Sequence, residues 1–290
     1  MSIARVIRSA LLADNPISRV ALAGYRATIP GRYFLRKLLL VPPWLVASRE
    51  ITNFTYDLTE QNRSYLANTI SAVTGVAVAQ IESFISEPEN DKELLAHITS
   101  LTRASRRRTI SDRVPRFGRR LGWYAIVRAI KPKLVIETGV DKGLGSVLLC
   151  AALLRNKAEG HDGYYYGTDI NPEAGFLLTG KWAQTGKILY GDSIESLRVI
   201  SGPIDLFVND SDHSADYELE EYRTVETKLS ADAIILGDNS HISKSLCTFA
   251  RETGRKFLFF AEQPLEHWYP GAGIGMCFRD DSTEAKRPTS

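Results

Sequence analysis

Two groups of polar side chains each follow a short apolar run in the second half of the chain. The first group is Asp210, Asp212 and His213, and the second is Asp238 and Asn239. Burying an unpaired carboxylate is costly, so acids placed in this way normally face a cation or a reacting group. A histidine beside them can accept a proton at neutral pH. The competing interpretation of each residue is a turn or a helix cap.

An acid followed by a glycine-rich loop marks another candidate site. Glu137 ends an apolar run, and Gly139, Gly143 and Ser146 follow it. Glycines let the backbone pass close to a ligand, and the helix that follows offers free N–H groups. The dinucleotide fingerprint G-x-G-x-x-G is absent, and an acid is a poor neighbour for a pyrophosphate, so we expect a cationic ligand. The alternative is a tight turn between a strand and a helix.

These residues resemble the class I S-adenosylmethionine-dependent methyltransferases. The first motif of that family is an acid, then Gly-x-x-x-Gly, then a small residue. Glu137, Gly139, Gly143 and Ser146 fit this motif, with Leu144-Gly145 as an insertion before the small residue. The resemblance implies that these residues bind S-adenosylmethionine, whose sulfonium and amino groups are cationic.

The resemblance extends to the next two apolar runs. Asp169 follows the first of them, where the family has an acid that binds the ribose, and a carboxylate can accept both ribose hydroxyls. An Asx-turn or helix cap before Pro172 is the alternative. Asp192 and Ser193 resemble the segment that contacts the adenine, and an N-cap for a helix over 193–199 competes with that role.

The two polar groups described first resemble those of small-molecule O-methyltransferases of the macrocin and catechol type. By this resemblance Asp210, Asp238 and Asn239 supply three oxygen ligands, a set that suits Mg2+, and Asp210 also contacts the cofactor. The candidate catalytic groups are Asp210, Asp212 and His213. In an alternative mechanism without a metal, His213 or Asp212 acts as the base.

Short β-rich runs alternate with helical ones after Pro115, which is typical of a parallel sheet covered by helices. The predicted strands are 133–137, 163–168, 187–189, 204–209, 233–236, 256–261 and 274–278. The connection over 262–273 is too short for a helical crossover, so the last strand is expected to be antiparallel. We therefore predict an α/β, Rossmann-like fold with a mostly parallel seven-stranded sheet.

Two regions follow from this pattern. Residues 57–100 have apolar side chains at intervals of three and four, as amphipathic helices do. We predict a helical N-terminal region with a basic arm over 1–115, and an S-adenosylmethionine-binding methyltransferase domain over 116–290.

Charge is unevenly spread along the chain. Its 36 Lys and Arg residues against 34 Asp and Glu residues give a net charge of +2, too small to indicate a nucleic-acid partner. Residues 1–47 nevertheless carry seven basic residues and one acid, so 7 − 1 = +6. Aromatic and leucine residues flank Arg36-Lys37, a mixture that suits the headgroup zone of an anionic membrane. The alternative is an arm packed on its own domain. Four arginines at 103 and 106–108 indicate a helix cap or a contact with an anion.

The remaining composition bears on location. No apolar run approaches the roughly 18 to 20 residues of a membrane-spanning helix, and the first residues lack the layout of a signal peptide. Three cysteines at no metal-ligand spacing are expected to be reduced thiols. We expect a cytoplasmic protein, with peripheral contact at the inner membrane surface as the alternative. The number of subunits is not indicated.

These features predict an enzyme that moves the methyl group of S-adenosylmethionine to a hydroxyl of a small molecule with help from a divalent metal. The first alternative is a methyltransferase that needs no metal. The second is a non-catalytic protein that binds a lipid surface or a protein partner on a methyltransferase scaffold.

Overall fold

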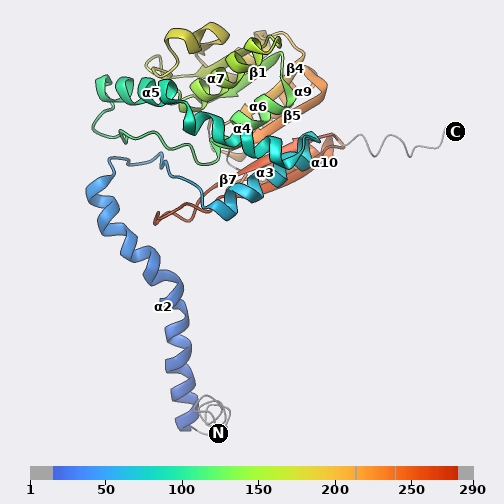
Figure 1. Ribbon diagram of the computed structural model, residues 1–290. Helices are drawn as coiled ribbons and strands as arrows, with labels where there is room; N and C mark the ends of the chain where they lie inside the picture. Colours follow the sequence, from blue (N-terminus) through green and yellow to red (C-terminus); the bar gives the residue numbers. More distant parts are fainter. Residues whose placement is uncertain (1–15, 213, 239, 280–290) are drawn as a thin grey trace, which may run out of the picture. The chain divides into compact units, whose positions relative to one another are not determined.

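The computed structural model describes residues 16–212, 214–238 and 240–279 (Figure 1). The described residues form two compact units, one of 16–48 with 266–269 and one of the remainder. The smaller unit consists mainly of one long helix, α2 (Pro16–Ala47). Prolines inside this helix remove backbone N–H donors from its hydrogen-bond ladder, and Figure 1 shows it bent.

The larger unit contains a seven-stranded sheet in the order β3-β2-β1-β4-β5-β7-β6. The strands are β1 (Leu134–Thr138), β2 (Tyr164–Asp169), β3 (Gly186–Tyr190), β4 (Ile204–Asn209), β5 (Leu229–Gly237), β6 (Lys256–Ala261) and β7 (Gly273–Phe278). Strands β1 to β5 pair in parallel, and β7 is antiparallel to both β5 and β6. The predicted Rossmann-like fold, with its antiparallel last strand, is confirmed.

Strand β5 is longer than its apolar run predicted. The prediction placed it over 233–236, but it begins at Leu229, which pairs with Ile204 of β4. The register between β4 and β5 then shifts before Leu206 pairs with Ile234. Residues 230–232, with the sequence Ser-Ala-Asp, lie in this irregular stretch and contain no large apolar side chain, which is why the hydrophobic pattern did not reveal it.

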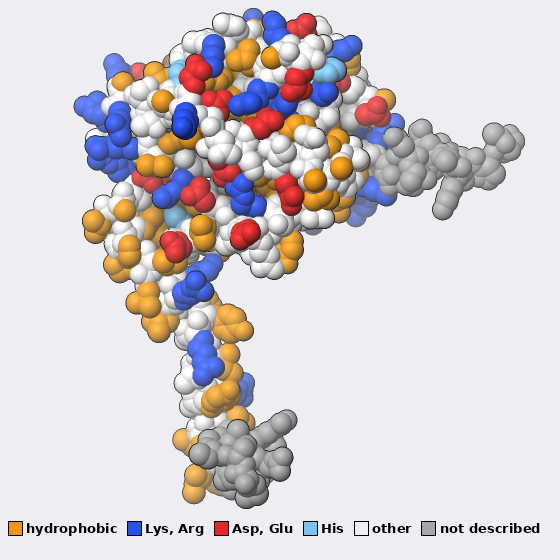
Figure 2. Space-filling model, in the orientation of Figure 1, with side chains coloured by type: hydrophobic (Ala, Val, Ile, Leu, Met, Phe, Trp, Pro, Cys, Tyr) orange, Lys and Arg blue, Asp and Glu red, His pale blue; other side chains and the backbone are white. Residues whose placement is uncertain are grey.

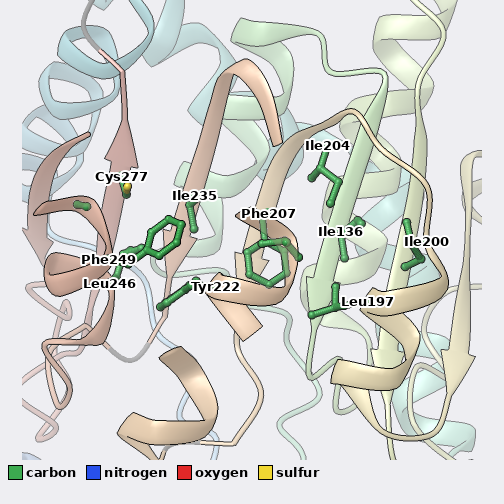
Figure 3. Packing of buried hydrophobic residues seen from close by; sticks show 12 residues of the cluster. Ile136, Leu197, Ile200, Ile204, Phe207, Tyr222, Ile235, Leu246, Phe249 and Cys277 are labelled. Carbon is green, nitrogen blue, oxygen red and sulfur yellow. The ribbon is translucent and has the colours of Figure 1, made fainter. Parts of the chain in front are cut away.

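Helices cover both faces of the sheet. They are α3 (Glu60–Thr74), α4 (Val78–Asn90), α5 (Lys92–Ala104), α6 (Arg120–Ile130), α7 (Leu144–Ala158), the 3-10 helix η1 (Gly180–Thr185), α8 (Ser193–Val199), α9 (Ala215–Glu226) and α10 (Ser245–Glu252). Helix α9 packs against α8 and α10, and its Tyr222 lies among Phe207, Ile235 and Phe249 in one hydrophobic cluster (Figure 3). Helix α6 packs against α7, α3 and α4.

The helices α3 and α4 belong to the same compact unit as the sheet. All residues of α6 from 121 to 128 are buried, as expected of a helix covered on every side. Asn62 of α3 also bonds the carbonyl of Ala261 and the N–H of Gln263, at 2.9 and 2.8 Å. The compact units therefore do not divide at residue 115, and the functional division at that point stays a prediction. No single helix in the described ranges is long and apolar enough to cross a membrane, although α3 and α4 reach that length and composition as a pair bent by 119°.

Candidate functional site

The carboxyl ends of the central parallel strands meet at one edge of the sheet. Backbone hydrogen bonds continue past the strand ends from Gly139 to Thr168, from Asp210 to Thr138 and from Asp238 to Asn209, at 2.9, 2.8 and 2.9 Å. They place the glycine loop after β1 beside the polar segments after β4 and β5. The predicted grouping of these motifs at a single edge is therefore observed, as expected for ligand sites in parallel sheets.

The glycine loop passes too close to its neighbours for side chains. Gly139 has φ +78°, and a Cβ atom there would lie 2.1 Å from the carbonyl oxygen of Asp210. Helix α7 begins directly after Gly143, so the apparent insertion Leu144-Gly145 forms its first turn. A Cβ on Gly145 would lie 2.2 Å from Glu137 Oε1, so this glycine makes room for the buried acid.

Glu137 and Ser146 lie together, bonded to each other. The Ser146 hydroxyl donates to Glu137 at 2.9 Å, and Tyr165 donates to the same carboxylate oxygen. Glu137 is fully buried, and burial raises its pKa to about 7. It also lines a small pocket at this edge. The other lining residues are Asn53, Thr55, Arg120, Val140, Asp141, Lys142, Leu144, Gly145 and Asp210.

Asp169 holds the glycine loop. Its carboxylate accepts the N–H groups of Val140 and Asp141 at 3.1 and 3.0 Å, and that of Asn171 at 2.8 Å. The last bond is the Asx-turn of the alternative interpretation. A carboxylate has about four acceptor positions, so one remains for a ribose hydroxyl. The ribose contact stays a prediction.

Asp192 and Ser193 take structural roles at the start of α8. Asp192 is the N-cap, accepting the N–H of Glu195 at 3.0 Å, and it also accepts the hydroxyl of Tyr217 at 3.0 Å. Ser193 bonds Tyr217 and Glu221. The capping alternative is therefore observed, and the adenine contact stays a prediction.

Glu221 of α9 is a buried acid that the sequence interpretation missed. It accepts hydrogen bonds from four side chains around the ends of β1 and β4. The donors are Thr138, Ser193, Asn209 and Ser211. Burial raises its pKa. A signal was present, because Glu218 and Glu221 share the helical spacing of the buried Tyr222 and Val225, where apolar residues are expected.

Arg119 neutralises Asp238. Its Nε and Nη2 atoms donate to the two carboxylate oxygens, and the side chains are only 12% and 3% exposed. Burial disfavours the ionised acid, but the charge of Arg119 outweighs this and lowers the pKa of Asp238. Glu262 completes the cluster, accepting the backbone N–H of Arg119 at 2.6 Å and the hydroxyl of Tyr56 at 2.7 Å.

The pKa of Asp210 shifts in the opposite direction from that of its neighbour Asp238. Its carboxylate lies 3.6 Å from Arg120 Nη2, and it is hydrogen-bonded to Asp238. Burial and the adjacent Asp238 raise the pKa of Asp210 well above its ordinary value, against the pull of Arg120 and Arg119. The pair therefore holds its negative charge mainly on Asp238 and favours a proton on Asp210. Nothing local in the sequence distinguished Arg119 and Arg120 from surface arginines.

The predicted metal ligands do not fit Mg2+ in this arrangement. Both oxygens of Asp238 bind Arg119, Asp210 faces Arg120, and Asn239 lies outside the described residues. Across the part of the chain that the structure describes, no group of three His, Cys, Asp or Glu side chains could hold a metal ion. A cation would have to displace a buried arginine, leaving charges uncompensated.

The remaining predicted catalytic groups have different positions. Asp212 is exposed and accepts the N–H of Ser214 at 2.8 Å, an Asx-turn directly before α9, whose N-cap is Ser214. His213 lies outside the described residues. His241, another histidine near this edge, has an exposed side chain, and its partial desolvation together with the charge of Arg119 lowers its pKa.

The arginine cluster reaches the glycine loop. Arg107 pairs with Asp141, whose other oxygen accepts the amide of Asn53 at 2.8 Å, and Arg106 pairs with Glu173 at 2.7 Å. Two of the four arginines in the cluster, Arg106 and Arg107, therefore pair with acids of the protein itself. Segments before residue 116 close this side of the pocket.

Comparison with known proteins supports the interpretation of the motifs. Residues 136–240 match the family model of a methyltransferase domain. No curated protein matches the sequence. Similar solved structures include a methyltransferase from Geobacter sulfurreducens, with 16% identity, a TM-score of 0.48 and coverage of 66% of this chain and 92% of that one. The SAH-bound Podospora anserina methyltransferase PaMTH1 has 15% identity, a TM-score of 0.47 and coverage of 80% and 99%. The SAM-bound O-methyltransferase TomG from Streptomyces achromogenes has 13% identity, a TM-score of 0.47 and coverage of 68% and 95%. The match over residues 136–240 agrees with the resemblance stated from the strand-end motifs, since this stretch contains all of them from Glu137 to Asn239.

Proposed function

We propose that this protein is a methyltransferase that transfers the methyl group of S-adenosylmethionine to a hydroxyl of a small molecule, without a divalent metal. The observation that carries the proposal is the pairing of Asp238 with Arg119 beside Asp210. Buried guanidinium groups stand where the resemblance placed a metal, and they leave one acid with a raised pKa in the pocket.

The pocket suits the amino-acid end of S-adenosylmethionine. That end carries a carboxylate and an ammonium, and the pocket lining contains both Arg120 and Lys142 and the acids Asp141 and Asp210. The buried Nε of Arg120 has no hydrogen-bond partner among the described residues, so it is available to a carboxylate. Burial lowers the pKa of Lys142, which a bound anion would oppose.

The cofactor supplies a methyl group already activated by its sulfonium. The task of the protein is then to align the acceptor and to receive its proton. Asp210 is the group we assign to that proton, because a carboxyl with a raised pKa is a better base near neutral pH. As the new O–C bond forms, the S–C bond breaks with its electron pair going to sulfur, and the hydroxyl proton goes to Asp210. Arg119 acts as a positioning residue, because its hydrogen bonds hold Asp238, which in turn is hydrogen-bonded to Asp210.

The test has two arms. Calorimetry should show binding of S-adenosylmethionine and S-adenosylhomocysteine in the micromolar range, about −8 kcal/mol. Methyl transfer from labelled cofactor to a panel of phenols and alcohols should be the same in excess chelator and in added Mg2+. Absence of cofactor binding would overturn the whole assignment. Loss of turnover in chelator with restoration by Mg2+ would instead refute the metal-free mechanism.

A further inference from the structure

Helix α2 exposes an unusual share of the large apolar side chains. Twelve of the 23 exposed large hydrophobic residues in the described ranges lie on it. Ile17, Val20, Phe34, Leu38 and Leu45 are between 63% and 83% exposed. Figure 2 shows orange hydrophobic side chains along α2, interspersed with blue basic ones. Exposed apolar surface of this extent marks an interaction site.

Eight of these twelve apolar residues share one side of the helix, and Leu22, Tyr25, Ile29 and Tyr33 lie on the opposite side. At about 100° per residue, the eight fall within an arc of roughly 140°. They are Ile17, Val20, Phe34, Leu35, Leu38, Leu39, Leu45 and Val46. The basic residues lie on both sides of that arc. On one side are Arg19, Arg26 and Lys37, and on the other are Arg32 and Arg36. This is the layout of a helix that lies in a membrane interface, with its apolar side inward and its cations at headgroup level.

The positive charge of α2 favours an anionic binding partner. Residues 16–47 contain five basic residues and no Asp or Glu, giving +5. A second copy of the helix would bring +5 against +5, which opposes self-association. An anionic bilayer offers both of the required features over a large area, acyl chains for the apolar arc and phosphates for the cations.

A shallow groove near Pro30 adds a local site of the same character. It is lined by Ile29, Pro30, Tyr33, Phe34 and Lys37. Aromatic rings beside a lysine suit the boundary between acyl chains and headgroups. With 32 residues, α2 is about 48 Å long, which allows it to lie along a bilayer surface over many lipids.

We propose that α2 binds the surface of an anionic lipid bilayer and lies in its plane. This binding goes beyond the methyl transfer proposed above and does not depend on it. Several cations acting together give reversible attachment that weakens with salt, because exposed charges are screened over about 8 Å at physiological ionic strength.

The experiment is co-sedimentation of the full chain with phosphatidylcholine vesicles, with and without phosphatidylglycerol, at low and high salt. One variant removes four charges from α2. It is Arg26→Gln, Arg32→Gln, Arg36→Gln and Lys37→Gln. A second variant, Phe34→Ser with Leu38→Ser and Leu45→Ser, removes apolar contacts. A matched control removes four exposed charges from the larger unit. It is Lys92→Gln, Arg103→Gln, Lys133→Gln and Arg251→Gln.

The wild type and the control should bind the phosphatidylglycerol vesicles equally. Both α2 variants should partition at least about tenfold more weakly, since each basic residue near the surface contributes severalfold. Because all the changed side chains are exposed, circular dichroism should show unchanged folding. Equal binding by all four proteins, or no binding by the wild type, would overturn the proposal. So would light scattering that shows a dimer lost only in the apolar variant without any vesicle binding, because the apolar arc would then face a second copy.

Discussion

At the scale of single residues, the candidate site is organised by buried ion pairs. Asp210 and Asp238 are neighbours, yet their pKa values shift in opposite directions because Arg119 donates two hydrogen bonds to Asp238 alone. The same two acids beside a metal would both be ionised. The arginine therefore determines that one of them can exchange a proton.

Asp210→Asn should lower kcat by about 10²- to 10⁴-fold, the usual contribution of a general base. Since the raised pKa of Asp210 sets the fraction of active base, the wild-type rate should rise with pH through that pKa, and the variant should lose the dependence. Cofactor affinity, measured by calorimetry below that pKa, should change little, because Asp210 is then protonated and the Asn side chain is a neutral group of the same shape. Asp212→Asn is the comparison, and a larger loss there than in Asp210→Asn would move the base to Asp212.

Arg119→Met should destabilise the protein by about 3 to 5 kcal/mol, because it leaves the carboxylate of Asp238 buried without its partner. Denaturant unfolding measures the change. The double variant Arg119→Met with Asp238→Asn should recover part of the loss. Arg106→Met removes an exposed pair with Glu173, 87% and 67% exposed, and should cost less than about 1 kcal/mol. A similar loss in the free energy of unfolding for Arg119→Met and Arg106→Met would contradict this account.

At the scale of elements, the carboxyl ends of the parallel strands and the starts of the following helices build the site. The loop between β1 and α7 is held on one side by Asp169 after β2 and touches the segment after β4 on the other. Glu221 of α9 accepts hydrogen bonds from Thr138 of β1 and Asn209 of β4, and so links these two strands at their carboxyl ends. Contacts between loops therefore set the shape of the pocket.

Gly139→Ala should abolish cofactor binding and reduce stability, because its Cβ would meet the backbone of Asp210 at 2.1 Å. Gly160→Ala is a matched control, since φ is +89° there and a Cβ would meet nothing within 4 Å. The control should lose only about 1 to 2 kcal/mol from the left-handed conformation. Calorimetry and thermal unfolding separate the two effects, and normal cofactor affinity in Gly139→Ala would show that the loop can move without loss of the site.

At the scale of the whole molecule, the larger unit extends well beyond the family match. Helices α3 and α4 cover α6, and Asn62 joins α3 to the connection between β6 and β7. The pocket also depends on this region, because Asn53 and Arg107 bind Asp141 of the glycine loop. The region before residue 116 is therefore part of the structure that carries the site.

A fragment of residues 116–290 should fail to unfold cooperatively, because it exposes the apolar surface of α6 that α3 and α4 cover. A fragment of residues 49–290 keeps that cover and should unfold in a single transition. Circular dichroism during heating compares the two. A cooperative transition in the shorter fragment at the same temperature would restore the boundary predicted at residue 115.

The sequence by itself determined the local patterns. Alternating apolar runs and glycines predicted the strands, their mostly parallel direction and the loop after β1, because these features depend on neighbouring residues and on rules that hold for all parallel sheets. The position of the motifs at the strand ends also predicted that they would group at one edge of the sheet, and the backbone hydrogen bonds show this grouping. The strand-end acids were identified by type, but their roles were not, because a carboxylate after a strand can cap, pair or bind a ligand with the same sequence around it.

Only the tertiary structure decided which partner each acid has. Arg119 and Asp238 are far apart along the chain, and their pairing depends on the start of α6 lying near the carboxyl end of β5 and on the burial of both side chains. The same holds for Glu221, whose four donors come from β1, β4 and the segments that follow β3 and β4. Burial changes the free energy of a charged side chain far more than the local sequence does. Asp238, which was predicted to be a metal ligand, is therefore paired with Arg119 in the structure.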